Sequence, residues 1–151
     1  RIHPNRGATV TQLSRDSLED MMEIRASISY CLLRRAVPLM TRDDFAQLQE
    51  IIEEEKHVAG LMETEALNYR FHELLTKKAG NSTADLIIEI LHANMDRYLR
   101  SGFYTGEDAR ENSIHEHQAI LDACREGDAE KAASLLQDHI LDARNRIPSN
   151  L

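Results

Sequence analysis

The stretch IHEHQAILDACREGDAEKAASLLQDHILDA, residues 114–143, decides the fold class. Its apolar residues recur at spacings of three and four, which is the repeat of a helix with one buried face. Gly127 interrupts this repeat and Asp128 follows it. That order is typical of one helix ending at a glycine and the next being capped by an aspartate. The stretch therefore predicts two consecutive helices joined by a tight turn.

The rest of the chain repeats this arrangement. Glycine and proline number only 6 and 3 in 151 residues, and most of them stand singly between apolar-periodic segments. Aromatic residues are few, with 3 Phe and 4 Tyr, which disfavours a β-sandwich or a barrel. We therefore expect an all-α fold with helices over residues 14–37, 41–59, 63–79, 81–101, 105–127 and 128–147.

Residues 1–13 differ from the rest. Pro4-Asn5-Arg6-Gly7 is a turn signal, and Ala8-Thr9-Val10-Thr11 after it resembles a short strand. We interpret this segment as the end of another unit, with the strand as one arm of a hairpin. The chain begins with Arg1 rather than methionine, and we expect it to be a piece of a longer protein.

The charge excludes some partners. With 18 Lys and Arg against 26 Asp and Glu, the net charge is −8, which predicts repulsion from nucleic acid and from anionic membranes. The sequence has no apolar run of the roughly 18 residues that span a membrane, and no secretory signal. Cys31 and Cys124 lack the spacing of a metal or redox motif and are expected to be packed free thiols. These features predict a cytoplasmic domain.

Helical wheels place polar residues among the apolar ones expected in the core. The inner face of the first helix would carry Leu18, Met21, Ile24, Ile28, Leu32 and Ala36, and that of the fourth Leu86, Ile87, Ile90, Leu91 and Tyr98. The polar residues that fall on or beside inner faces are Arg25, Asn68, His72, Asn94, Arg97, His117 and His139. Burying such groups without partners costs several kcal/mol, so they must be paired, hydrated or bound to a ligand.

Three inward histidines on three different helices indicate a metal site. His72, His117 and His139 supply imidazoles, a favoured ligand of Zn, Ni, Cu and Fe. Asn68 lies four residues before His72, so the two side chains project together and the carboxamide oxygen could complete the set. The other helical histidines, His57, His92 and His115, fall on polar arcs and are expected to be solvated.

A rival metal constellation is less favourable. Glu54–His57 and Glu89–His92 both have the Glu-x-x-His spacing of di-iron carboxylate bundles. Both pairs face outward on the wheel, and the first belongs to the charged run Glu53-Glu54-Glu55-Lys56, which we expect to be a solvated face.

Several motifs resemble one bacterial family. The run N-Y-R-F-H-E-L-L at 68–75 with A-G-N at 79–81 resembles the D-x-x-F-H…A-G-N signature of the FCD domain, the C-terminal effector domain of GntR transcription regulators. The segment H-E-H-Q-A-I-L-D-A-C-R-E-G-D-A-E-K-A at 115–132, with H-I at 139–140, is similar to the family's histidine segment. L-E-D-M-M-E-I-R at 18–25 resembles its opening helix, and N-R-G-A-T-V at 5–10 resembles the end of a winged helix-turn-helix wing.

The resemblance implies an antiparallel bundle of six to seven helices over residues 14–151 that forms a homodimer. Residues 1–13 would be the remnant of the wing and its linker. The family's metal ligands fall on Asn68, His72, His117 and His139, with Asn68 where the family usually has aspartate. The implied cofactor is a divalent ion, with zinc favoured and nickel or another ion as alternatives, and the implied ligand is a small carboxylate effector.

These observations together predict a sensor. The effector would bind the metal and pair with Arg25, with Arg97 and Asn94 nearby, and would modulate operator DNA binding by an N-terminal domain outside this chain. A metal-dependent hydrolase or lyase is the alternative from another class. It would need a general base, and the wheels of helices three, five and six show no inward Asp or Glu, so we expect no catalytic residues. A metal-free dimerisation module is a third interpretation, which leaves the inward histidines unexplained.

Overall fold

The structure, a computed structural model, describes residues 2–3, 7–8, 14–100 and 107–143. Within these residues the chain forms six α-helices, two short 3₁₀ helices and one pair of two-residue strands. In chain order they are β1 (Ile2–His3), β2 (Gly7–Ala8), α1 (Arg15–Ala36), η1 (Val37–Leu39), α2 (Arg42–Glu55), α3 (Leu61–Thr76), η2 (Lys77–Ala79), α4 (Ser82–Arg100), α5 (Glu107–Arg125) and α6 (Ala129–Asp142). The predicted all-α fold class is confirmed.

The helix boundaries follow from local capping chemistry. Ser14 caps α1 by accepting a hydrogen bond from the Ser17 backbone N–H, and Thr41 and Asp44 form a reciprocal capping box at α2. Gly127 takes φ of 74°, a left-handed conformation that glycine adopts without a steric penalty. Asp128 then accepts from the Lys131 N–H at 3.0 Å, so α6 begins directly after the turn.

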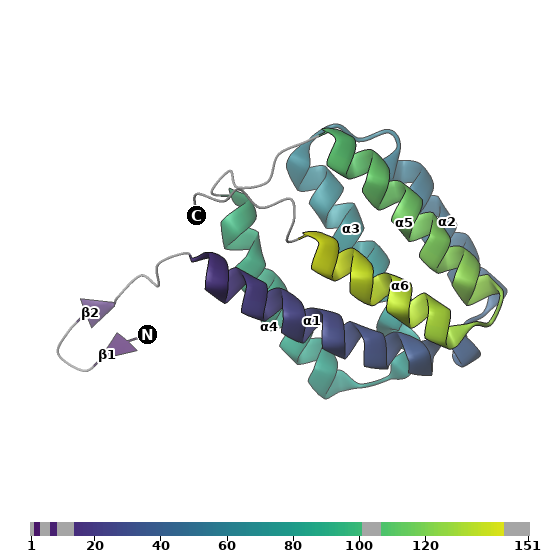
Figure 1. The fold of residues 1–151 in the computed structure, drawn as a ribbon, viewed down its shortest axis with the longest axis horizontal. Helices are drawn as coiled ribbons and strands as arrows, with labels where there is room; N and C mark the ends of the chain where they lie inside the picture. The colour runs from purple at the N-terminus through teal and green to yellow at the C-terminus, as the bar shows by residue number, and fades with distance from the viewer. Residues whose placement is uncertain (1, 4–6, 9–13, 101–106, 144–151) are drawn as a thin grey trace.

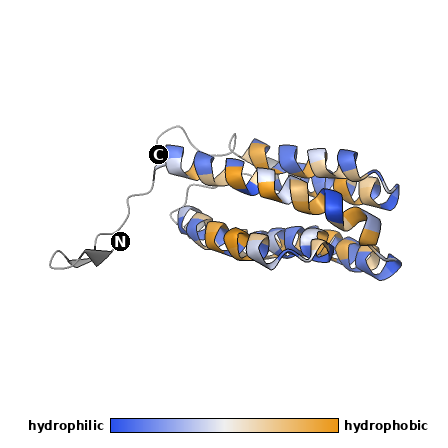
Figure 2. Ribbon diagram, turned by 90° about the horizontal axis from the view of Figure 1, so that it is seen from below, coloured by the Kyte–Doolittle hydropathy of each residue, from blue (hydrophilic) through white to orange (hydrophobic). Residues whose placement is uncertain are grey.

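The six helices form two packed layers. α1 packs against α6, α3 and α4, while α5 packs against α6 and α2, and α2 against α3. Figure 1 shows α6 lying alongside α1, with α5 and α2 side by side beyond it. Figure 2 shows the two layers from below, with hydrophobic and hydrophilic residues alternating along each helix, as amphipathic helices require.

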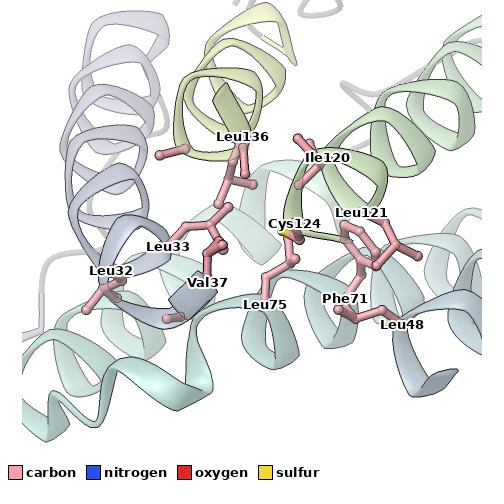
Figure 3. Packing of buried hydrophobic residues seen from close by; sticks show 14 of the residues in the cluster. Leu32, Leu33, Val37, Leu48, Phe71, Leu75, Ile120, Leu121, Cys124 and Leu136 are labelled. Carbon is pink, nitrogen blue, oxygen red and sulfur yellow. The ribbon is translucent and has the colours of Figure 1, made fainter. Parts of the chain in front are cut away.

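The main core lies between the layers. It draws fully buried residues from five helices, with Leu33 from α1, Leu48 from α2, Phe71 and Leu75 from α3, Ile120 and Leu121 from α5, and Leu136 from α6. Figure 3 shows these side chains converging around Cys124. A second cluster of Leu18, Met22 and Tyr98 joins α1 to α4. There the Tyr98 hydroxyl donates to the Ser14 carbonyl at 3.1 Å and accepts from its N–H at 3.2 Å, which fastens the start of α1.

The predicted inner face of α4 is wrong in part. Leu91 and Tyr98 are buried, but the side chains of Leu86, Ile87 and Ile90 are 57%, 39% and 54% exposed. A wheel identifies the apolar arc of a helix but not the part of it that meets a neighbour. α4 packs against α1 at one margin of the bundle, and the described residues leave the rest of its arc uncovered. Ile24 on α1, also expected inside, is 50% exposed.

The ends of the chain show smaller differences. The strand-like segment at 8–11 coincides only with β2, which pairs antiparallel with β1, a strand that the sequence did not reveal. Residues 9–11 and the predicted ends of the fourth and sixth helices lie outside the described residues. Both cysteines are free thiols, but only Cys124 is buried and Cys31 is exposed. Among the described residues, no helix is both long and apolar enough to cross a membrane.

Candidate metal centre

Three histidines from three helices meet inside the bundle. His72 on α3, His117 on α5 and His139 on α6 are 7%, 0% and 5% exposed. Each offers a ring nitrogen, and these three atoms all lie within 4.8 Å of one another. The ring centroids are separated by 4.6 Å between His117 and His139, 5.0 Å between His72 and His139, and 5.5 Å between His72 and His117.

Neighbouring apolar side chains fix where these rings lie. Phe71 is fully buried beside His72 on α3, and its ring stacks on His117 with centroids 4.2 Å apart. His117 precedes the fully buried Ile120 by three residues, and His139 follows Leu136 by three, so each lies on the apolar side of its own helix. The same periodicity that builds the core therefore brings the histidines together.

Two of the three imidazole rings, those of His117 and His139, each contact a glutamate carboxylate through Nδ1. Nδ1 of His117 lies 2.9 Å from Oε2 of Glu55, at the end of α2. Nδ1 of His139 lies 2.5 Å from Oε2 of Glu116, on α5. An ionised carboxylate only accepts hydrogen bonds, so when both carboxyl groups are ionised both Nδ1 atoms donate and both Nε2 atoms keep their lone pairs.

The two Nε2 atoms then face each other at a distance that suits a metal ion. They lie 3.2 Å apart in the interior of the protein. Two lone pairs at that distance repel unless a cation or a proton lies between them. Two nitrogen ligands of a tetrahedral zinc ion, each bound at about 2.0–2.1 Å, would be about 3.3 Å apart. The spacing and the donor type therefore fit a divalent transition metal.

His72 and Asn68 add two further candidate ligand atoms on α3. Nε2 of His72 and Oδ1 of Asn68 are buried and have no hydrogen-bond partner among the described residues. Buried polar atoms are almost always satisfied, and an ion or molecule bound beside these two atoms, on successive turns of α3, would satisfy them. Arg25 on α1 donates from Nη2 to Nδ1 of His72 at 3.3 Å and is 5% exposed.

Burial shifts the titration of this centre. Burial, with the nearby charges of His139 and Arg25, holds the pKa of His72 well below its usual value, so the ring is neutral as a metal ligand requires. Burial also raises the pKa of Glu55 to about 7, partly opposed by His139. Burial, which disfavours the charged form of each group, is the largest cause of both shifts.

The structure does not bring all the predicted effector residues to the histidines. The Arg97 side chain is exposed, so the expectation that it faces inward is wrong. Asn94 is half-buried, and its Nδ2 donates to the Ile90 carbonyl of its own helix at 2.7 Å. α4 approaches the site through Met95 instead, whose Sδ lies 4.0 Å from Nη1 of Arg25.

The remaining histidines behave nearly as expected. His57 and His115 are exposed, as are Glu54 and Glu89, so the described structure offers no support to the rival Glu-x-x-His pairs. His92 differs because it is half-buried and stacks on Tyr69 with centroids 3.8 Å apart.

Sequence reasoning missed Glu55 and Glu116. The charged run around Glu55 predicts a solvated side chain, yet Glu55 is 2% exposed. The signal was present, because Glu55 follows Leu48, Ile51 and Ile52 by seven, four and three residues and so shares their face of α2. Glu116 is only half-buried, but it contacts His139. The expectation that α5 places no carboxylate at the site is therefore wrong.

Comparison with known proteins identifies the domain type. A family model described as the FCD domain matches residues 20–142. The HTH-type transcriptional repressor RspR of Escherichia coli (strain K12) is 28% identical over 146 residues, which cover 93% of this chain and 62% of that protein. The HTH-type transcriptional regulator BphR of Paraburkholderia xenovorans (strain LB400) is 28% identical over 148 residues, covering 89% of this chain and 58% of that protein.

Solved structures share the fold. A GntR-family transcriptional regulator from Pseudomonas syringae pv. tomato superposes with a TM-score of 0.74 at 22% identity, covering 97% of this chain and 62% of that one. McbR/YncC of E. coli gives a TM-score of 0.78 at 21% identity, covering 94% and 73%. The chain spans only 58–62% of the length of the two curated relatives above.

Proposed function

This chain belongs to the FCD domain family, and we propose from that membership that it is the sensory domain of a cytoplasmic GntR-type transcription regulator. In this proposal the domain binds a divalent metal and a small organic-acid effector, and a winged helix-turn-helix domain outside this chain binds operator DNA. Residues 1–13 would be the end of the wing and its linker. The regulator descriptions of the similar proteins support this assignment.

The observation that carries the proposal is the meeting of His72, His117 and His139 in the core. Three neutral imidazoles with Asn68 on the preceding turn of α3 form a donor set suited to zinc, or to nickel and similar ions. A divalent ion bound there would supply a Lewis acid with open positions for an effector's carboxylate or hydroxyl oxygen.

Arg25 is the residue best placed to pair with the effector's negative charge. Its guanidinium is buried beside His72, and a buried guanidinium binds a carboxylate through strong charge-assisted hydrogen bonds. It also lies on α1, the helix that follows directly from residues 1–13. An effector that binds more tightly to one position of α1 would therefore change the orientation of any domain attached before it.

The exposed apolar face of α4 supports the expected homodimer. Leu86, Ile87 and Ile90 lie on one side of α4, and all three are substantially exposed. Single exposed apolar residues are common, but a contiguous group on one helix is typical of an interface. In a homodimer a second copy would cover this face with the same face of its own α4, by two-fold symmetry.

The proposal is tested by metal analysis combined with thermal shift. The purified chain should contain close to one equivalent of a divalent metal per chain, and members of an organic-acid panel should raise its melting temperature only without chelator. The double variant His117→Ala/His139→Ala should lose both the metal and the acid-induced shift. His115→Ala, an exposed histidine on the same helix as His117, is the matched control and should retain both.

Other outcomes would favour the alternatives. A chain that binds no metal when purified and reconstituted would point to a metal-free dimerisation module. Consumption of an acid from the panel, measured by chromatography, would point to a metal-dependent hydrolase or lyase, for which Glu55 and Glu116 now supply nearby carboxylates.

A further inference from the structure

Glu55 occupies an electrostatically unfavourable position. It is 2% exposed and is the last residue of α2, where the partial negative charge at the end of the helix disfavours a carboxylate. The last turn of α2 contains no basic residue. An isolated buried carboxylate costs several kcal/mol, so Glu55 needs a cation close by. Nδ1 of His117, at 2.9 Å, is the hydrogen-bond partner that the described residues give it.

Glu116 contacts Nδ1 of His139 in the same way that Glu55 contacts Nδ1 of His117. It accepts from Nδ1 of His139 at 2.5 Å, and its side chain is 33% exposed. Each of the two histidines whose Nε2 atoms face each other at 3.2 Å thus has a carboxylate behind it. A carboxylate at Nδ1 fixes the orientation of an imidazole, keeps its proton on Nδ1 and makes Nε2 a stronger donor to a metal.

The charges at the site also favour a role for Glu55 and Glu116 in metal binding. Three neutral imidazoles and the neutral amide of Asn68 would leave both positive charges of a divalent ion uncompensated by the ligands. Arg25 beside His72 adds another positive charge. When ionised, Glu55 and Glu116 place two negative charges behind the imidazoles of His117 and His139, at their Nδ1 atoms.

We propose that Glu55 and Glu116 are positioning residues of the metal centre, which orient His117 and His139 for coordination and supply the negative charge that Asn68 does not. The inference rests on the proposed metal-binding function. It also makes α2, which contributes none of the predicted ligands, part of the centre through Glu55.

The experiment separates charge from orientation with two kinds of variant. Glu55→Gln and Glu116→Gln remove the charge but keep an oxygen that can accept from Nδ1–H. Glu55→Met and Glu116→Met remove both. Zn²⁺ affinity is measured by competition with a chromophoric chelator, and the Co²⁺ absorption spectrum reports the ligand geometry. Glu54→Gln, an exposed neighbour on α2, and Glu111→Gln, an exposed residue on α5, are the matched controls.

We expect each glutamine variant to weaken Zn²⁺ affinity by about tenfold, and each methionine variant to approach a hundredfold, within the range typical of such outer partners. The methionine variants should also alter the Co²⁺ spectrum, whereas the controls should match the parent chain. Nitrogen NMR of the metal-free protein gives a second readout. His117 and His139 should carry their protons on Nδ1 in the parent chain and lose that preference in the corresponding methionine variants.

The possible failures are distinguishable. If the parent chain binds Zn²⁺ and all four variants bind it equally well, the positioning role is wrong while the proposed function stands. If the methionine variants lose affinity but their folded metal-free forms keep the Nδ1 proton, orientation by these carboxylates is wrong. If the parent chain binds no metal, the proposed function and this inference both fail.

Discussion

Arg25 on α1 donates a hydrogen bond to Nδ1 of His72 on α3 across 3.3 Å. A guanidinium has no acceptor, so Nδ1 of His72 must be the acceptor in this contact. A neutral imidazole has one such nitrogen, and coordination of a metal also uses it. The contact with Arg25 and coordination by His72 therefore exclude each other.

This exclusion predicts that Arg25→Met has opposite effects on the binding of Zn²⁺ and on the binding of the organic-acid effector. Without the competing hydrogen bond and the adjacent positive charge, we expect Zn²⁺ to bind several-fold more tightly. The organic acid identified by thermal shift should bind at least about tenfold more weakly, because one charge-assisted hydrogen bond contributes about 1.5–3 kcal/mol. Isothermal titration of each ligand measures both effects.

Arg35→Met, an exposed arginine on the same helix, is the control and should change neither affinity. Weaker binding of both ligands would mean that Arg25 supports the centre rather than competing with it.

Asn68 provides the second prediction. A neutral amide is a weaker ligand than a carboxylate for a divalent ion, so Asn68→Asp should raise Zn²⁺ affinity by at least about tenfold. Because Nδ2 of Asn68 lies 3.4 Å from Oε2 of Glu65, the substitution is best compared in both the parent and Glu65→Gln backgrounds. Chelator competition gives the affinity. Asn94→Asp, on α4, should leave it unchanged, and an unchanged affinity in Asn68→Asp would remove Asn68 from the ligand set.

The fold was predictable from sequence because each helix end is determined locally. Gly127 and Asp128 define the α5–α6 turn by their own backbone preferences, and the Thr41–Asp44 capping box does the same for α2. The burial of His72, His117 and His139 was predictable because all three share the 3.6-residue period of the apolar residues around them. Their role as ligands stays a prediction.

What could not be predicted depends on contacts between helices. Glu55 lies in a run of charged residues. Its burial results from α2 packing against α5, where its carboxylate contacts Nδ1 of His117. Leu86 and Ile90 have the periodicity of buried residues, but α4 has no neighbour on that side in the described chain. Local patterns show which face of a helix is apolar, and only tertiary structure shows what covers it.

The exposed face of α4 gives the third prediction. If Leu86 and Ile90 lie in a homodimer interface, Leu86→Glu/Ile90→Glu should place like charges opposite each other and weaken the dimer at least tenfold. Size-exclusion chromatography with light scattering over a range of concentrations measures this change. The melting temperature extrapolated to low concentration should hardly move, because both side chains are more than half exposed in the single chain. Ala119→Glu, at an exposed position on α5 and outside this face, is the control. A parent chain that is monomeric, or a variant that dimerises unchanged, would contradict the interface.

The capping box of α2 gives a prediction independent of the metal centre. Oδ2 of Asp44 accepts from the Thr41 backbone N–H at 2.7 Å and from its hydroxyl at 2.8 Å, and lies 3.3 Å from Nζ of Lys78. Asp44→Ala should lower the free energy of unfolding at pH 7 by about 1 kcal/mol, as measured by urea denaturation. Asp43→Ala is the control, because it removes an exposed acid from the same helical turn without breaking the box and should have a smaller effect.

The difference in unfolding free energy between the parent chain and Asp44→Ala should depend on pH, because it depends on the charge of Asp44. Burial acts to raise the pKa of this carboxyl, but the hydrogen bonds from Thr41 and Lys78 outweigh it and leave the pKa lowered. A carboxyl with a lower pKa in the folded state stabilises the fold fully above its unfolded pKa of about 4 and loses this contribution as the pH falls through the folded value. The gap between the parent chain and Asp44→Ala should therefore be constant from pH 7 to about pH 5 and shrink below about pH 4. A gap that widens on acidification would mean that Asp44 stabilises α2 in its protonated form.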